Sequence, residues 1–337
     1  MQAEWVWYPS VGTLLAPGYA GLSIWLKGKG TTDEGPRHSF LVASRLSGFV
    51  LLGMGILTGF FVITFDLNAG LTTWFLATAA LGAYAVLFRE PRYVFAAAAL
   101  GFLPFTIQVA DLLQAARVAQ TLDWLGVSWA GLAALYLVGL LLLRKFPSYG
   151  KWLGLMAHLL LPGVFMLMML SALLEDNWKS LPALASVGSM VLVYLFSAGL
   201  HDTGKFPALS GWLDFLPVSL RKGAFLWPVG GLIPIWGTLA WYGSGLAWDG
   251  LGAAFAGLGL VYTGLGIWLA QRDISYRLPL HVYAFLLPVV GILIAFDSPY
   301  LLMTTLYLTV LLVVWMAALY RSTFLVTVAG GLLIWPF

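Results

Sequence analysis

The chain has 337 residues, of which 61% are hydrophobic and only 9% are charged, and its formal net charge is +3. Soluble globular proteins carry about 25% charged residues, so this composition excludes a soluble globular protein and predicts a surface that faces lipid. The absence of cysteine excludes disulfides, thiolate metal sites and iron–sulfur clusters. The basic residues form no dense block, which argues against nucleic acid as a partner.

The hydropathy pattern predicts an all-α, polytopic integral membrane protein with about twelve transmembrane helices. Each apolar stretch is close to the roughly 20 residues that cross a bilayer as a helix. In chain order, the expected spans are 7–26, 40–65, 70–88, 93–111, 124–143, 152–174, 180–200, 224–246, 250–270, 278–296, 299–320 and 322–337.

Charged residues mark the ends of these spans in a recurring order. An acidic residue opens a stretch five times, and a basic residue closes it 21 to 29 residues further on. The pairs are Asp66 with Arg89, Asp123 with Arg144, Asp176 with Lys205, Asp249 with Arg272 and Asp297 with Arg321. Because one membrane-crossing helix fills such an interval, the order predicts repeated helical hairpins after an N-terminal helix pair.

Prolines distinguish the two helices of each predicted hairpin. Those in the second helices are Pro104, Pro162, Pro228, Pro234, Pro288 and Pro336. Proline inside a helix removes a backbone donor, so we expect alternate helices to be kinked. The carbonyl that loses its donor must find another partner in hydrocarbon. Kinked helices of this kind either line a cavity, as broken helices do in transporters, or merely curve a stack of hairpins.

The positions of lysine and arginine predict the orientation of the chain. In this arrangement only Arg117 and Lys179 lie on the side opposite to the other basic residues. Because basic loops stay in the cytoplasm, we expect the N-terminus outside, and a bacterial cytoplasmic membrane as the default location. We also expect the natural chain to continue beyond Phe337, because it stops inside an apolar stretch soon after Arg321.

The same pattern predicts four regions. They are an N-terminal transmembrane helix pair (1–65), hairpin repeats (66–200), a cytoplasmic interfacial segment (201–223) and further hairpin repeats (224–337). The interfacial segment mixes tryptophan and leucine with charged residues, as helices in the plane of a membrane surface do.

Four residues are candidates for contact with a substrate. Arg45 lies two turns inside the second span, where a charge is costly, so it either snorkels to the membrane surface or pairs, or else contacts a ligand anion. Pro228, Pro234 and Trp236 belong to the least regular span, where we expect a binding site if the chain has one.

Three histidines are candidates for binding a cofactor, whose identity the sequence does not indicate. His158, His201 and His281 all fall in the predicted inner leaflet, where neutral imidazole can ligate a metal, haem or chlorin. No two of them are three or four residues apart, so each is equally well explained as a hydrogen-bonded residue near a helix end. The sequence shows no recognisable metal-binding cluster or group of catalytic residues.

Glycines form two seams in span 250–270. Gly250, Gly257 and Gly264 share one seven-residue register, and Gly252, Gly259 and Gly266 share another. Small residues in one register let helices approach closely, so these seams predict tight packing against neighbouring helices or a partner.

Three functions are compatible with these features. The leading hypothesis is a non-catalytic membrane subunit or scaffold, surrounded by membrane lipids and joined to other membrane subunits or to itself through glycine-rich helices. The first alternative is a transporter or channel for a small apolar or weakly polar solute. The second is a membrane enzyme or a pigment- or haem-binding protein that uses the inner-leaflet histidines.

Overall fold

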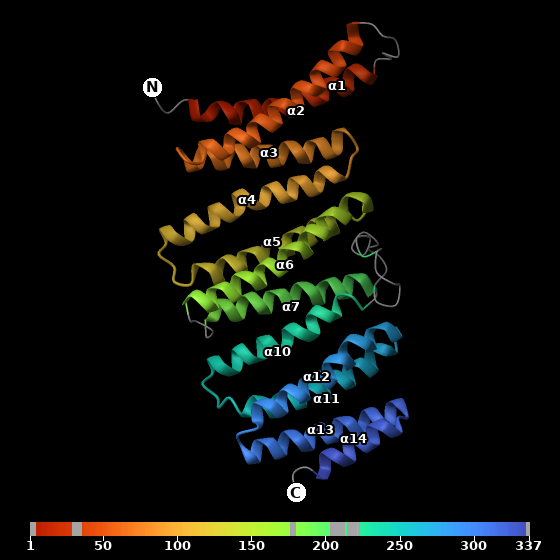
Figure 1. Ribbon diagram of the computed structural model, residues 1–337. Helices are drawn as coiled ribbons and strands as arrows, with labels where there is room; N and C mark the ends of the chain where they lie inside the picture. Colours follow the sequence, from red (N-terminus) through yellow and green to blue (C-terminus); the bar gives the residue numbers. More distant parts are fainter. Residues whose placement is uncertain are drawn as a thin grey trace. The chain divides into compact units, whose positions relative to one another are not determined.

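The computed structural model describes residues 5–28, 36–175, 180–202, 213, 221 and 223–334. These residues form α-helices and two short 3-10 helices, with no strand among them (Figure 1). The α-helices are α1 (Tyr8–Gly28), α2 (Pro36–Val62), α3 (Leu67–Leu87), α4 (Arg92–Ala115), α5 (Thr121–Leu142), α6 (Pro147–Glu175), α7 (Leu181–Asp202), α10 (Leu226–Gly243), α11 (Gly250–Ala270), α12 (Arg277–Ala295), α13 (Pro299–Tyr320) and α14 (Thr323–Ile334). The 3-10 helices are η1 (Trp5–Trp7) and η3 (Ile274–Tyr276).

Each predicted span overlaps one of these helices, and nine helices of the described ranges are long and apolar enough to cross a membrane. The nine are α2 to α7 and α11 to α13, which makes the chain a multi-pass integral membrane protein. Helix α14 is shorter, with 12 residues, while α1 and α10 are rich in glycine, proline, tyrosine and tryptophan, which lower their hydropathy. Crossing by all twelve helices therefore remains a prediction, as does the hairpin repeat.

The chain divides into two compact units. Unit 1 comprises Met1–Thr121 and Leu132–Leu160, and unit 2 comprises Leu122–Gly131 and Leu161–Phe337. The division passes through α5 and α6, so each of these helices contributes to both units. Most of the predicted interfacial segment, 201–223, lies outside the described residues, and so does Pro336.

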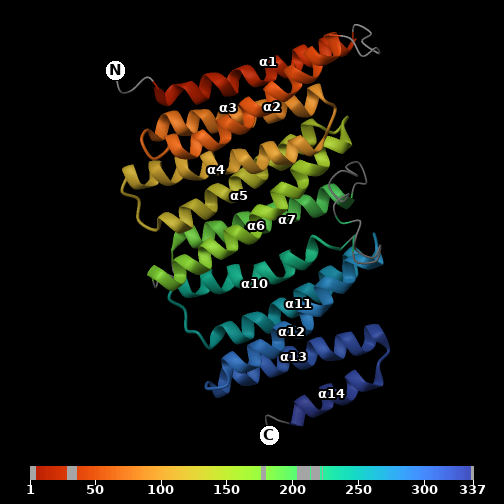
Figure 2. The same cartoon turned by 45° about the horizontal axis from the view of Figure 1, so that its top comes forward.

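In unit 1, α1 packs against α2 and α3, and α3 packs against α4 (Figures 1 and 2). Small residues bring α1 and α3 together, because Ala16 and Ala80 are buried in their interface region. The Tyr84 hydroxyl of α3 donates to the Ala16 carbonyl of α1 over 3.2 Å. A Cβ at Gly48 would lie 2.9 Å from the Tyr84 oxygen, so this glycine makes room for the bond.

In unit 2, α11 packs against α12 and α13, and α10 packs mainly against α7. The seam of Gly252, Gly259 and Gly266 is buried, as predicted. A Cβ at Gly252 would overlap the carbonyl oxygen of Gly291 in α12, and one at Gly259 would lie 2.9 Å from the Ala284 carbonyl. The helices therefore approach backbone to backbone, where dispersion contacts are most numerous.

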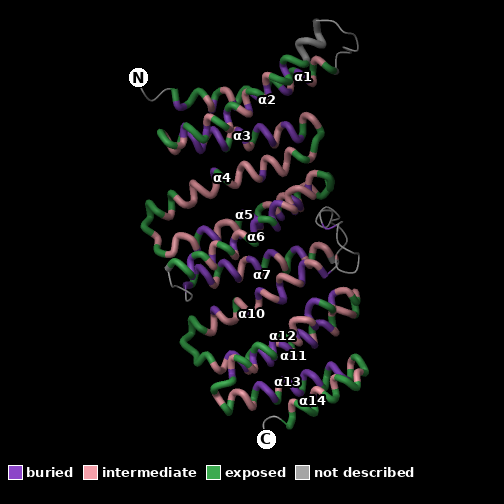
Figure 3. Tube along the Cα trace, in the orientation of Figure 1, coloured by how far each residue is buried: buried purple, intermediate pink, exposed green. Residues whose placement is uncertain are grey.

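Along single helices, buried and exposed residues alternate by turns (Figure 3). The exposed positions are as apolar as the buried ones: Val261, Leu293 and Leu311 are each more than half exposed. Such a surface is incompatible with water and is what a lipid-facing helix presents. Association of these helices rests on close packing and hydrogen bonds rather than on a hydrophobic difference between inside and outside.

Several helices of the described ranges end on an arginine instead of the usual glycine. Arg89 after α3 and Arg321 after α13 both have a φ of 52°, in the left-handed region. The next amide then bonds five residues back: Glu90 N–H donates to Ala85 over 3.2 Å, and Ser322 N–H donates to Ala317 over 3.1 Å. This is the Schellman arrangement, which satisfies carbonyls that the helix end leaves open.

Interior prolines alternate among the helices of the described ranges. They occur in α4, α6, α10 and α12, and also in α1, but not in α3, α5, α11 or α13. Because α7 also has no interior proline, prolines mark every second helix from α3 to α13 in the described ranges, and the kinks expected at them stay a prediction.

Candidate functional site

Pro234 lies inside the continuous helix α10, and the hydrogen bond that it cannot donate is replaced from another helix. Pro234 has no N–H, so the Gly230 carbonyl one turn earlier lacks its helical donor. The hydroxyl of Tyr262, which is buried in α11, donates to that carbonyl over 3.0 Å. A free carbonyl in hydrocarbon would be costly, and this bond removes the cost.

Gly230 and Gly231, near Pro234, leave one side of α10 without side chains, so that a neighbouring residue can contact its backbone. The ring of Tyr283 from α12 lies directly against Gly230, where a Cβ would overlap it, and its hydroxyl oxygen lies 3.0 Å from the Cβ position of Gly231. Trp227 packs edge-on against the same ring, with 6.1 Å between centroids. The irregular sequence of α10 thus holds an aromatic side chain against the helix backbone.

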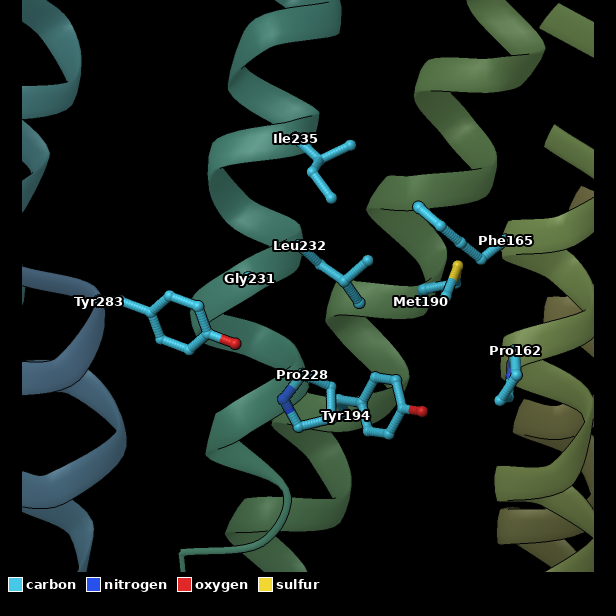
Figure 4. A pocket seen from close by; sticks show the side chains of 9 residues that line it. All are labelled: Pro162, Phe165, Met190, Tyr194, Pro228, Gly231, Leu232, Ile235 and Tyr283. Atoms are coloured by element: carbon cyan, nitrogen blue, oxygen red, sulfur yellow. The ribbon is translucent and has the colours of Figure 1, made fainter. Parts of the chain in front are cut away.

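Beside this contact lies an open recess of about 260 Å³, formed by residues from four helices of unit 2. Its lining residues are Pro162 and Phe165 of α6, Met190 and Tyr194 of α7, Pro228, Gly231, Leu232 and Ile235 of α10, and Tyr283 of α12. Figure 4 shows Leu232 and Met190 facing one another across the recess, with Pro162 and Phe165 on its far side. Three of the four contributing helices, α6, α10 and α12, contain an interior proline.

The chemistry of the recess is almost entirely apolar. Its side-chain polar atoms are the hydroxyls of Tyr194 and Tyr283. Tyr283 reaches in from α12 beside Gly231, and the Tyr194 hydroxyl points away from α10 toward the side of α6 (Figure 4). Among the described residues, no charged one lines this recess. The arrangement suits a small apolar body with one or two hydrogen-bonding groups.

The structure separates the four residues predicted to contact a substrate. Pro228 lines the recess, whereas Pro234 is buried within α10 and Trp236 is 42% exposed, with its indole nitrogen beside Gly188 of α7. Arg45 belongs to unit 1, where its guanidinium lies 4.9 Å from the centre of the Phe88 ring. Only Pro228 of the four therefore belongs to this recess.

The histidine His281 has protein partners on both ring nitrogens. Its Nδ1 lies 2.6 Å from the Tyr320 hydroxyl and 3.4 Å from Nε of Arg277, and its Nε2 lies 3.3 Å from the Thr263 carbonyl. Arg277 can only donate and a carbonyl can only accept, so this pattern assigns the imidazole proton to Nε2. The guanidinium of Arg277 also lies 4.4 Å from the centre of the Tyr320 ring. A cofactor at His281 would have to displace one of these partners.

The other two histidines lie apart from His281. His158 belongs to unit 1, is buried in α6, and has its Nδ1 2.7 Å from the Gly154 carbonyl. His201 belongs to unit 2 and packs edge-on against Phe225. Within the described part of the chain, no three His, Asp or Glu side chains gather as a metal site would require. Cofactor binding by these residues stays a prediction.

Sequence reasoning did not identify the residues that give the recess its shape. Met190, Tyr194 and Tyr283 are ordinary members of apolar helices, and no local pattern distinguishes them. The one available signal was Gly230–Gly231 next to a proline, because paired glycines inside a helix indicate a bulky neighbour on the backbone. That signal points to α10 but not to the helix that faces it.

Comparisons with protein-family models, curated proteins and solved structures found no match to this chain. The arrangement of this chain's own residues is therefore the basis for inferring its function.

Proposed function

We propose that the chain binds a small apolar or weakly polar molecule within the membrane, as a transporter or channel for such solutes must. The observation that carries this proposal is the recess lined by helices with interior prolines. Its volume of about 260 Å³ is just below the usual range for ligand pockets, about 300–1,000 Å³, which favours a small molecule. Its apolar lining with two phenol hydroxyls favours a solute that is mostly hydrocarbon or aromatic.

A probe with this chemistry tests the proposal directly. We expect 2-naphthol, an aromatic body with one hydroxyl, to bind saturably to the protein in nanodiscs, measured by titration calorimetry against empty nanodiscs. Leu232→Trp places a larger side chain into the recess and should abolish the saturable component. Leu286→Trp is the matched control, because Leu286 lies on α12 outside the recess and is 53% exposed. Equal binding by both variants would contradict the proposal.

A membrane subunit is the second candidate, and the outer face of α11 favours it. Gly257 has open space at its Cβ position, and neighbouring Val261 is 53% exposed. A small residue on an exposed face lets a helix of another subunit approach closely. Gly257→Leu should then leave the isolated chain stable but remove co-purifying subunits from native membranes. Unchanged co-purification would count against this candidate.

A further inference from the structure

Unit 2 has a second recess, whose lining residues differ from those of the proline-lined one. It has a volume of about 300 Å³ and lies among α7, α10, α11, η3 and α12. Its rim faces outward: Leu195 is 43% exposed, Leu265 is 41% exposed and Trp268 is 54% exposed. Its floor is buried, with Val229, Tyr262, Tyr276 and Leu280 among the residues that form it. We call this recess the α11 groove.

The α11 groove has the length of one membrane leaflet. Its lining residues on α11 are Tyr262, Leu265, Trp268 and Leu269, and Arg272 follows in the turn after the helix. From Tyr262 to its end at Ala270, α11 rises by about 12 Å at 1.5 Å per residue, and Arg272 lies two residues further on. The hydrocarbon core of a bilayer is about 30 Å thick, so half of it matches this length.

One end of the groove carries the basic side chain of Arg272, next to Asp273 in the chain, and the rest is mainly apolar. Arg272 is exposed there, and its guanidinium lies 5.4 Å from the centre of the Trp268 ring. The neighbouring carboxylate of Asp273 accepts the Ser275 N–H over 2.9 Å and so caps η3. Tryptophan and arginine together are typical of the level at which lipid headgroups lie.

We propose that the α11 groove binds an anionic phospholipid, with its phosphate at Arg272 and an acyl chain along the apolar floor. The occupant must be hydrocarbon over the depth of one leaflet and negatively charged at its end, and an anionic lipid combines both properties. Gly199 of α7 widens the groove, since its Cβ position has no neighbour within 4 Å. This site shares no residue with the recess of the proposed function.

Two substitutions address the two halves of the site separately. Gly199→Trp places a large side chain in the groove, and no atom lies within 4 Å of the Gly199 Cβ position to obstruct it. Gly82→Trp on α3 is its control, because the Gly82 Cβ position is equally open but lies in unit 1. Arg272→Gln removes the charge, and Arg321→Gln is its control, since Arg321 is also an exposed arginine of unit 2 outside the groove.

The measurement is lipid retention by the full chain. Each protein is reconstituted with equal phosphatidylglycerol and phosphatidylcholine, extracted in mild detergent, and its bound lipids are counted by native mass spectrometry. We expect the wild type and both controls to retain phosphatidylglycerol preferentially. Arg272→Gln should lower that preference about fivefold, and Gly199→Trp should remove retention of both lipids. Equal losses for Arg272→Gln and Arg321→Gln, or full retention by a monodisperse Gly199→Trp, would overturn the proposal.

Discussion

The hydroxyl of Tyr262 supplies to α10 the hydrogen bond that Pro234 takes away. Tyr262→Phe leaves the Gly230 carbonyl buried and without a donor, since the present bond of 3.0 Å is lost. We expect a loss of about 1–2 kcal/mol in the free energy of unfolding, because hydrogen bonds between membrane helices are worth about that much. Chemical unfolding in detergent micelles measures this loss.

The double variant makes this prediction specific. In a Pro234→Ala background, the new alanine N–H can itself bond to the Gly230 carbonyl. Tyr262→Phe should then cost much less than it does beside the native proline. An identical cost in both backgrounds would show that Tyr262 contributes through packing alone, and not by replacing the lost donor.

Other residues show why single positions are hard to assign from sequence. Asp66 and Asp123 both open predicted spans, but Asp66 caps α3 by accepting the Ala69 N–H over 3.0 Å. Asp123 is instead buried, and the Ser180 hydroxyl donates to its Oδ2 over 2.5 Å. The serine lies 57 residues away, so no local pattern could distinguish the two acids.

At the scale of elements, the arginines with left-handed backbone at helix ends predict an unusual effect of substitution by glycine on stability. Arg89→Gly relieves a left-handed conformation that costs an arginine about 1 kcal/mol, and this gain offsets the lost charge at the helix end. Arg144 also follows a helix, α5, but has no positive φ. Arg144→Gly should therefore be less stable than Arg89→Gly by about 1 kcal/mol. Chemical unfolding of the two variants decides this, and a smaller stability for Arg89→Gly contradicts it.

The glycine seam of α11 predicts a contrast between two positions two residues apart. Gly259→Leu collides with the Ala284 carbonyl, Pro288 and Leu312, and should cost more than about 2 kcal/mol of unfolding free energy. Gly257→Leu meets open space and should be neutral or slightly stabilising, because leucine favours helix more than glycine does. Thermal unfolding in detergent compares them. Equal stability of the two variants would mean that the seam does not set the packing of α11.

The positions of the helices were predictable from this sequence, but which helices pack against one another was not. Twelve apolar stretches with charges at their ends suffice to place the helices, because length and composition are local properties. Which residues contact a neighbouring helix depends on which side of each helix is turned toward that neighbour. Because these helices are apolar on all sides, the sequence does not indicate which side that is. Tyr283 illustrates this, since nothing in α12 indicates that it lies on the backbone of α10.

For the whole molecule, the open question is whether α10 crosses the membrane. If it does, Lys205 before it and Arg272 after α11 lie on the same side, as basic loops do. If it does not, α11 carries Arg272 to the side opposite Lys205. The strong bias of basic residues to one side therefore favours a crossing, although α10 is less apolar than the nine clear spans.

Cysteine labelling in the intact membrane tests this topology, and the cysteine-free chain is a ready background. Single cysteines at Lys205 and Gln271 should react with an impermeant maleimide from one side, and a cysteine at Ser244 should react from the other. Glu90→Cys and Ala119→Cys, at opposite ends of the clear span α4, calibrate the two sides independently of α10. If Lys205 and Ser244 react from the same compartment, α10 does not cross. In that case α10 could not lie beside the middle of α6 and α7 within the bilayer, and the recess that these helices line together would not form.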